Sequence, residues 1–140
     1  MKGLLTLIKL HRRQLDQLRR QQAEKETQKE QLHDVLTRMI EELEHERQLA
    51  YENVEMSQFF GGYAKRIKER QEIVMKEIMK LDKEIRELAL EITEKFSELK
   101  KFEIARDNRL KRMKDEAERK ERIMMDDIAI QGHSRKEENS

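Results

Sequence analysis

The feature that most constrains the fold is a repeat of apolar residues, spaced alternately four and three residues apart, in a chain without proline. This spacing puts one apolar stripe on an α-helix and is typical of coiled coils. We call this stripe the seam. In the first half of the chain, nine of its fifteen positions are apolar. The polar members include three neighbours, Gln22, Lys25 and Lys29, which predict a polar middle of the seam. The fifteen positions are Leu4, Ile8, His11, Leu15, Leu18, Gln22, Lys25, Lys29, Leu32, Leu36, Met39, Leu43, Glu46, Ala50 and Asn53.

The second half carries a stronger seam. Seven of its first eight positions are apolar. After Ile92 the repeat needs an extra four-residue step to reach Phe96, which predicts a stutter that locally unwinds the supercoil. The repeat then resumes at Leu99 and runs to Met124. The first eight positions are Ile67, Gln71, Val74, Ile78, Leu81, Ile85, Leu88 and Ile92.

Gly61 and Gly62 separate the two seams and are the only glycines between Gly3 and Gly132. Each weakens a helix by about 1 kcal/mol relative to alanine, so we expect the chain to reverse there. The predicted fold is all-α: two long helices form an antiparallel coiled-coil hairpin with an overhanging C-terminal helix. We expect a single domain over residues 1–132. Its first helix would cover about 4–56, its turn about 57–62 and its second helix about 63–130, with 133–140 as a disordered tail.

The charges support pairing of the two helices. If the reversal centres near Phe60, paired residue numbers add to about 119. Residues 38–56 then have a net charge of −4 and face residues 63–81 with a net charge of +3. Residues 1–20, at +5, face residues 99–118, at +2, so the end with both termini is basic and favours an acidic partner. Residues 117–130 have no partner on the shorter first helix, although they include apolar side chains.

Composition narrows the class of protein. Charged residues make up 44% of the chain and aromatic residues 4%, which is too few bulky side chains for one compact core. No apolar run approaches the roughly 18 residues of a membrane span, and with no cysteine we expect a soluble cytoplasmic protein. The chain has no phosphate-binding loop, paired Cys/His spacing or nucleophile elbow, so we expect no enzyme, cofactor, metal or small-molecule substrate. Nucleic-acid binding is not favoured, because no aromatic or glycine residues interleave with the Lys/Arg.

Half of the six aromatic residues crowd the predicted tip at Phe59, Phe60 and Tyr63. They either clasp the turn or form a contact surface. At the other end, Met124 and Met125 either fill a core or contact a partner.

Several stretches resemble the flagellar type III export chaperone FliJ family along nearly the whole chain. They are Leu4-Leu5-Thr6-Leu7, Phe60-Gly61-Gly62-Tyr63-Ala64-Lys65-Arg66-Ile67, Phe102-Glu103-Ile104-Ala105-Arg106-Asp107-Asn108-Arg109, Glu118-Arg119-Lys120-Glu121 and Asp126-Asp127-Ile128-Ala129. The resemblance implies a stalk-like antiparallel coiled coil without enzymatic activity. It would bind the export ATPase hexamer, promote its assembly and couple it to the export gate, with a general escort role.

The resemblance also implies two sets of contact residues. The gate's cytoplasmic domain and export chaperones would contact the tip set, which is Phe59, Phe60, Tyr63, Ile67, Arg70 and Val74. Ile67 and Val74 are also seam positions, so packing competes for them. The ATPase would contact the terminal set, which is Arg12, Arg13, Arg19, Arg109, Arg112, Arg119, Arg122, Met124 and Ile128. The implied location is the cytoplasm, peripheral to the inner membrane at the flagellar base.

Two other functions fit the same pattern. One is a homo-oligomeric coiled-coil scaffold. The other is a membrane-surface rod that binds through Leu4–Arg13.

Overall fold

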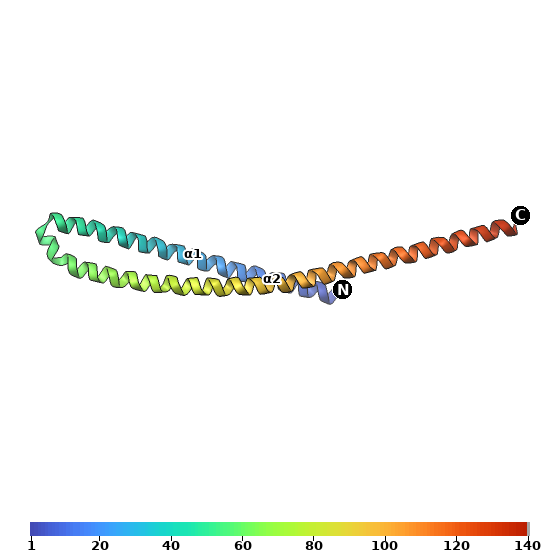
Figure 1. The fold of residues 1–140 in the computed structure, drawn as a ribbon, viewed down its shortest axis with the longest axis horizontal. Helices are drawn as coiled ribbons and strands as arrows, with labels where there is room; N and C mark the ends of the chain where they lie inside the picture. Colours follow the sequence, from blue (N-terminus) through green and yellow to red (C-terminus); the bar gives the residue numbers. More distant parts are fainter. Residues whose placement is uncertain (140) are drawn as a thin grey trace. The chain divides into compact units, whose positions relative to one another are not determined.

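The computed structural model describes residues 1–139, and almost all of them lie in two α-helices (Figure 1). Helix α1 spans Lys2–Glu52 and helix α2 spans Val54–Glu138, and no strand occurs among the described residues. Strong helix formers dominate both segments and proline is absent, so nothing local interrupts either helix. The prediction of an all-α protein made of two long helices that pack together is confirmed.

The two helices meet at Asn53. Its backbone N–H still donates to the carbonyl of Leu49, as in a helix, while its side-chain Oδ1 accepts a hydrogen bond from the N–H of Glu55 at 3.0 Å. Asparagine is a preferred N-cap because its side-chain oxygen satisfies one of the unpaired N–H groups of the first helical turn. Asn53 therefore ends α1 and starts α2.

The predicted turn at residues 57–62 is wrong, and so is the predicted end of the first helix at residue 56. Residues 54–62 are helical, and neither Gly61 nor Gly62 has a positive φ. A glycine lowers helix stability by only about 1 kcal/mol, whereas a capping side chain actively starts a new helix. The asparagine, rather than the glycine pair, therefore marks the boundary.

The second helix is also longer than predicted. It continues through Gly132 to Glu138, so residues 133–138 of the expected disordered tail are helical, and Ser140 lies outside the described residues. His133 Nε2 lies 3.1 Å from an oxygen of Glu137. Arg135 and Lys136 lie in the last turn, where their positive charges interact favourably with the helix dipole and stabilise the helix end.

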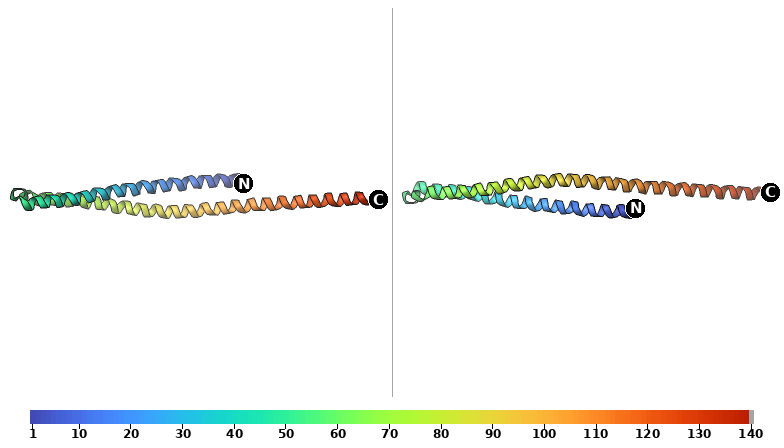
Figure 2. Two further views of the ribbon diagram at one scale, coloured as in Figure 1. Left: turned by 90° about the horizontal axis from the view of Figure 1, so that it is seen from above. Right: turned by 90° about the horizontal axis from the view of Figure 1, so that it is seen from below.

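The chain divides into two compact units. The central unit is Arg13–Lys95, and the terminal unit joins Met1–Arg12 to the chain from Phe96 onward. Figure 2 shows α1 and α2 of the central unit side by side. Each unit therefore contains a part of both helices.

The predicted seam forms the core of each unit. Leu15, Ile67, Ile78 and Leu88 are buried in the central unit, and Ile8 and Leu99 are buried in the terminal unit. Every seam position predicted from Leu4 to Ala50, and every one from Ile67 to Ile92, is at least half-buried. The seam prediction is confirmed over these two ranges, whereas Asn53 and the predicted positions from Leu110 to Met124 are exposed.

The polar middle of the seam is held by ion pairs between the helices. Lys25 Nζ lies 2.7 Å from an oxygen of Glu84, and Lys29 Nζ lies 2.6 Å from an oxygen of Asp82. The hydrogen bond from Lys29 lowers the pKa of Asp82, that from Lys25 lowers the pKa of Glu84, and the bond to Asp82 raises the pKa of Lys29. All four side chains are about one-third exposed, so water screens these pairs.

These pairs show a register different from the predicted one. Their residue numbers add to 109 and 111, whereas the prediction placed the value near 119. The difference is about one heptad, and a seam that repeats every seven residues presents the same apolar stripe after such a shift. The apolar pattern and the charge counts therefore could not fix the register.

The predicted stutter at Phe96 is also wrong. Lys95 is half-buried at the seam position, which keeps the four-three spacing intact from Ile92 to Leu99. Phe96 is 43% exposed, and the Lys100 ammonium lies 5.4 Å from the centre of its ring. The long aliphatic part of a lysine can cover a seam while its charge stays in water, so hydrophobicity alone misplaced the position.

Candidate functional site

The junction of α1 and α2 carries a group of exposed apolar side chains. Tyr51 is 93% exposed, Val54 80% and Phe59 76%, and Met56 is also exposed. We call these four residues the junction surface. Exposed apolar side chains occur along both helices, and these four lie close together in the sequence where α1 ends and α2 begins.

The tip set predicted from the resemblance divides between this surface and the core. Phe59 and Arg70 are exposed and Phe60 and Tyr63 are half-buried. Ile67 is buried, so its side chain serves the core and is not available to a partner. Val74 is half-buried at a seam position.

A shallow groove brings the predicted aromatics together. Phe59, Phe60 and Tyr63 line it, together with Glu46, Met56 and Arg66. The reading of Phe59 as part of a contact surface is therefore compatible with the structure, and Phe60 and Tyr63 form the partly covered floor.

Sequence reasoning missed Tyr51 and Val54. Both flank Asn53, and an asparagine followed two residues later by Glu55 at a helix start is a recognisable capping signal. Reading that signal would have placed the junction, and with it the exposed residues, about eight residues earlier in the chain.

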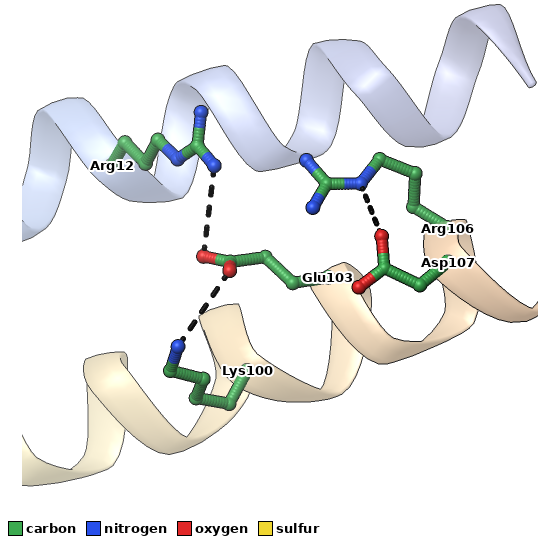
Figure 3. A network of polar contacts seen from close by, with 5 residues as sticks. All are labelled: Arg12, Lys100, Glu103, Arg106 and Asp107. Carbon is green, nitrogen blue, oxygen red and sulfur yellow. Dashed lines mark hydrogen bonds and ion pairs between the residues drawn. The ribbon is translucent and has the colours of Figure 1, made fainter.

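In the terminal unit, Glu103 lies between two cations (Figure 3). One of its oxygens lies 3.8 Å from Arg12 of α1, and the other lies 3.7 Å from Lys100 of α2. Arg106 reaches back from α2 toward α1, and its Nε lies 3.0 Å from Asp107 (Figure 3). Arg12 of the basic start of α1 thus meets an acidic side chain of residues 99–118, a segment that is basic overall.

His11 adds a second contact to this region. Its ring stacks on that of Phe102 with centroids 5.0 Å apart, and its Nδ1 lies 3.7 Å from Glu98. His11 is half-buried, as expected for a polar seam residue. A ring pair of this kind stabilises the packing by roughly 1 kcal/mol.

The predicted terminal set does not form one cluster. Arg12 pairs with Glu103 in the terminal unit, whereas Arg13 and Arg19 belong to the central unit. The remaining members lie on α2 in the terminal unit and are exposed: Arg109, Arg112, Arg119, Arg122, Met124 and Ile128.

Met124 and Ile128 belong to an apolar stripe that no described residue covers, whereas Arg112, Arg119 and Arg122 lie on the far side of the helix at 3.6 residues per turn. All residues from 107 to 139 are exposed. Leu110 and Met113, which the prediction omitted, share one helix face with Ala117, Met124 and Ile128 because their spacings are three, four or seven residues. We call these five residues the free stripe. It continues the face of α2 that carries Leu99, Phe102 and Arg106, where α1 packs in the terminal unit.

The segment that carries the free stripe is basic overall. Residues 109–122 contain seven Lys/Arg and four Asp/Glu. A helix that presents apolar side chains at this spacing is suited to pack against another helix or groove, and its net positive charge favours an acidic partner.

No family model, curated protein or solved structure matches this chain.

Two further properties of residues 1–139 bear on the candidate site. They contain no group of three or more His, Cys, Asp and Glu side chains that could hold a metal ion. Neither helix has a stretch both long and apolar enough to cross a membrane.

Proposed function

We propose that this chain is a non-enzymatic coupling component of flagellar type III protein export, similar to the FliJ family. It would bind the export ATPase ring, promote its assembly and link it to the export gate. The observation that carries the proposal is the free stripe, an apolar face on a net-basic segment of α2 that no described residue covers.

The proposal takes the chain to be an antiparallel hairpin. In the central unit, Lys25 pairs with Glu84 and the later Lys29 pairs with the earlier Asp82. Pairing in which one residue number rises as the other falls is expected of two helices that run in opposite directions. In this arrangement α2 extends beyond the start of α1, and residues 107–138 form the overhang.

The overhang is the proposed contact with the ATPase. Leu110, Met113, Met124 and Ile128 are each half-exposed or more, and residues 109–122 carry seven Lys/Arg against four Asp/Glu. An apolar stripe supplies the burial that stabilises a complex, and the net positive charge of this segment favours an acidic partner surface.

The junction surface is the proposed contact with the export gate and with export chaperones. It is formed by Tyr51, Val54, Met56 and Phe59, with Arg70 exposed on α2. Exposed tyrosine and phenylalanine provide large contact areas at little entropic cost, which suits them to partner binding. The chain would act in the cytoplasm, next to the inner membrane at the flagellar base.

Removal of residues 117–140 tests the proposal. We expect the truncated chain to remain helical, because every buried residue lies before residue 117. We expect it to lose stimulation of a purified flagellar export ATPase. Stimulation that equals that of the full chain would refute the proposal.

A homo-oligomeric scaffold is the second candidate, since the free stripe could also pack against a second copy. Sedimentation equilibrium separates the two. A monomer at micromolar concentration excludes the scaffold, and a stable dimer that dissociates when Met124 and Ile128 are replaced by glutamate supports it.

A further inference from the structure

The glycine pair has no structural explanation in the register that the structure shows. Gly61 and Gly62 lie inside α2 with negative φ, and no atom lies within 4 Å of a Cβ placed on either residue. Neither close packing nor backbone conformation therefore requires glycine, yet each costs the helix about 1 kcal/mol. A second arrangement of the chain would explain them.

Most of the interface repeats every seven residues. The seam of α2 presents Ile67, Val74, Leu81 and Leu88 at heptad spacing, and its flank presents Glu77, Glu84, Glu91 and Glu98 at the same spacing. If α2 moves by one heptad relative to α1, the seam remains apolar. Lys25, now paired with Glu84, then meets Glu91.

Lys29 does not have this redundancy. Its partner Asp82 is followed seven residues later by Ala89 and preceded by Met75. In either shifted register Lys29 would face an apolar residue without a carboxylate. The same holds for Arg12 in the terminal unit, because the residue seven positions after its partner Glu103 is Leu110.

A buried amide favours the shifted register. The Nε2 atom of Gln71 is buried and has no hydrogen-bond partner. In the register found here, Gln71 lies opposite Met39, which offers it no oxygen, whereas a shift of one heptad places it opposite Glu46. A buried donor without an acceptor costs about 1–3 kcal/mol, so the shift would relieve a real penalty.

We propose that the hairpin has two registers one heptad apart and that the Lys29–Asp82 pair selects the one found here. In the shifted register the reversal would move from near Glu55 to near Gln58 and Phe59, next to Gly61 and Gly62. The glycine pair would then begin the second helix, where its flexibility is useful. The shift carries α2 about 10 Å along α1.

This inference rests on the antiparallel hairpin of the proposed function, and not on its partners. The chain has no cysteine, so two can be introduced for spin labels without background. Gln17 and Lys83 are exposed and both belong to the central unit, which makes them suitable sites. A shift of one heptad lengthens the distance between their labels by roughly 9 Å.

The test compares two lysine variants by electron–electron distance measurement. Lys29→Ala removes an ion pair that only the present register can form, and we expect a second distance peak, longer by roughly 9 Å. Lys25→Ala is the matched control, since it removes a pair that both registers can form, and we expect one short distance. Asp82→Asn, an isosteric change, should reproduce the effect of Lys29→Ala in a fully folded chain.

The glycines are tested in the Lys29→Ala background. Gly61→Ala with Gly62→Ala should remove the longer distance, because alanine favours continuous helix there. A single short distance in both Lys29→Ala and Asp82→Asn would overturn the proposal. An equally strong second peak in Lys25→Ala, or a longer peak that survives the glycine replacements, would also contradict it. An ATPase assay bears on none of these outcomes, so the two proposals can fail separately.

Discussion

The ammonium of Lys29 lies 2.6 Å from a carboxylate oxygen of Asp82 and connects the two helices at the polar middle of their seam. The pair occupies the part of the interface with the least apolar packing, since Gln22, Lys25 and Lys29 follow one another along the seam. Charged residues within a coiled-coil seam reduce stability but specify alignment. The charged residues in the polar middle of the seam therefore specify the alignment of the two helices more strongly than the apolar residues do.

Acidification should weaken this pairing. The pKa values of Asp82 and Glu84 are lowered by their lysine partners, so their contribution is present above the unfolded-state pKa of about 4 and is lost as pH falls through the folded value. We expect the thermal midpoint to hold down to about pH 5 and to fall below that pH, measured by circular dichroism. Asp82→Asn should reduce this fall, whereas Asp34→Asn, at an exposed position, should leave it unchanged.

The same pair predicts the behaviour at high pH. The pKa of Lys29 is raised, so its contribution is complete below the unfolded-state pKa of about 10.4 and is lost only as pH rises through the folded value. The midpoint should therefore hold to about pH 10 and then decline. A decline that is just as steep in Lys29→Ala would contradict this assignment.

Adjacent residues of α2 provide a matched test of the core. Ile78 is buried, whereas Met79 is 69% exposed. We expect Ile78→Ala to lower the free energy of unfolding by about 2–4 kcal/mol and Met79→Ala by less than about 0.5 kcal/mol, measured by urea denaturation. Similar losses for the two variants would show that this face of α2 is not the packed one.

Two phenylalanines test the course of the seam after Ile92. Phe102 is half-buried against His11, and Phe96 is exposed beside Lys100. We expect Phe102→Ala to cost about 2 kcal/mol or more and Phe96→Ala about 1 kcal/mol at most. The reverse order would restore the stutter that the sequence predicts at Phe96.

The sequence predicts the buried residues of this fold but not the alignment of its helices. The four-three spacing reports which side chains face inward, and it correctly placed the buried residues Ile8, Leu15, Ile67, Ile78 and Leu88. It repeats every seven residues, so it could not choose between alignments a heptad apart. The alignment depends on single contacts such as that of Lys29 with Asp82. Composition and net charge are summed over whole segments, so they do not show such contacts.

The boundary between the two helices differs from the predicted one for another reason. The low helix propensity of Gly61 and Gly62 predicts a turn there, but the capping side chain of Asn53 determines where α2 starts. The arginines of the terminal set follow from the resemblance, and all of them are exposed in the structure. Leu110 and Met113 were missed because they look like seam residues, and only the structure shows that no described residue covers them.

The most direct test of the proposed function is the affinity of the full chain for a purified flagellar export ATPase, measured by calorimetry. Met124→Glu with Ile128→Glu alters the free stripe, and Ile73→Glu with Met79→Glu makes the same replacements at exposed positions of the central unit. We predict at least a tenfold loss of affinity, about 1.4 kcal/mol, for the first variant and none for the second. Equal affinities of the two variants and the unaltered chain, or no binding by any of them, would contradict the proposal.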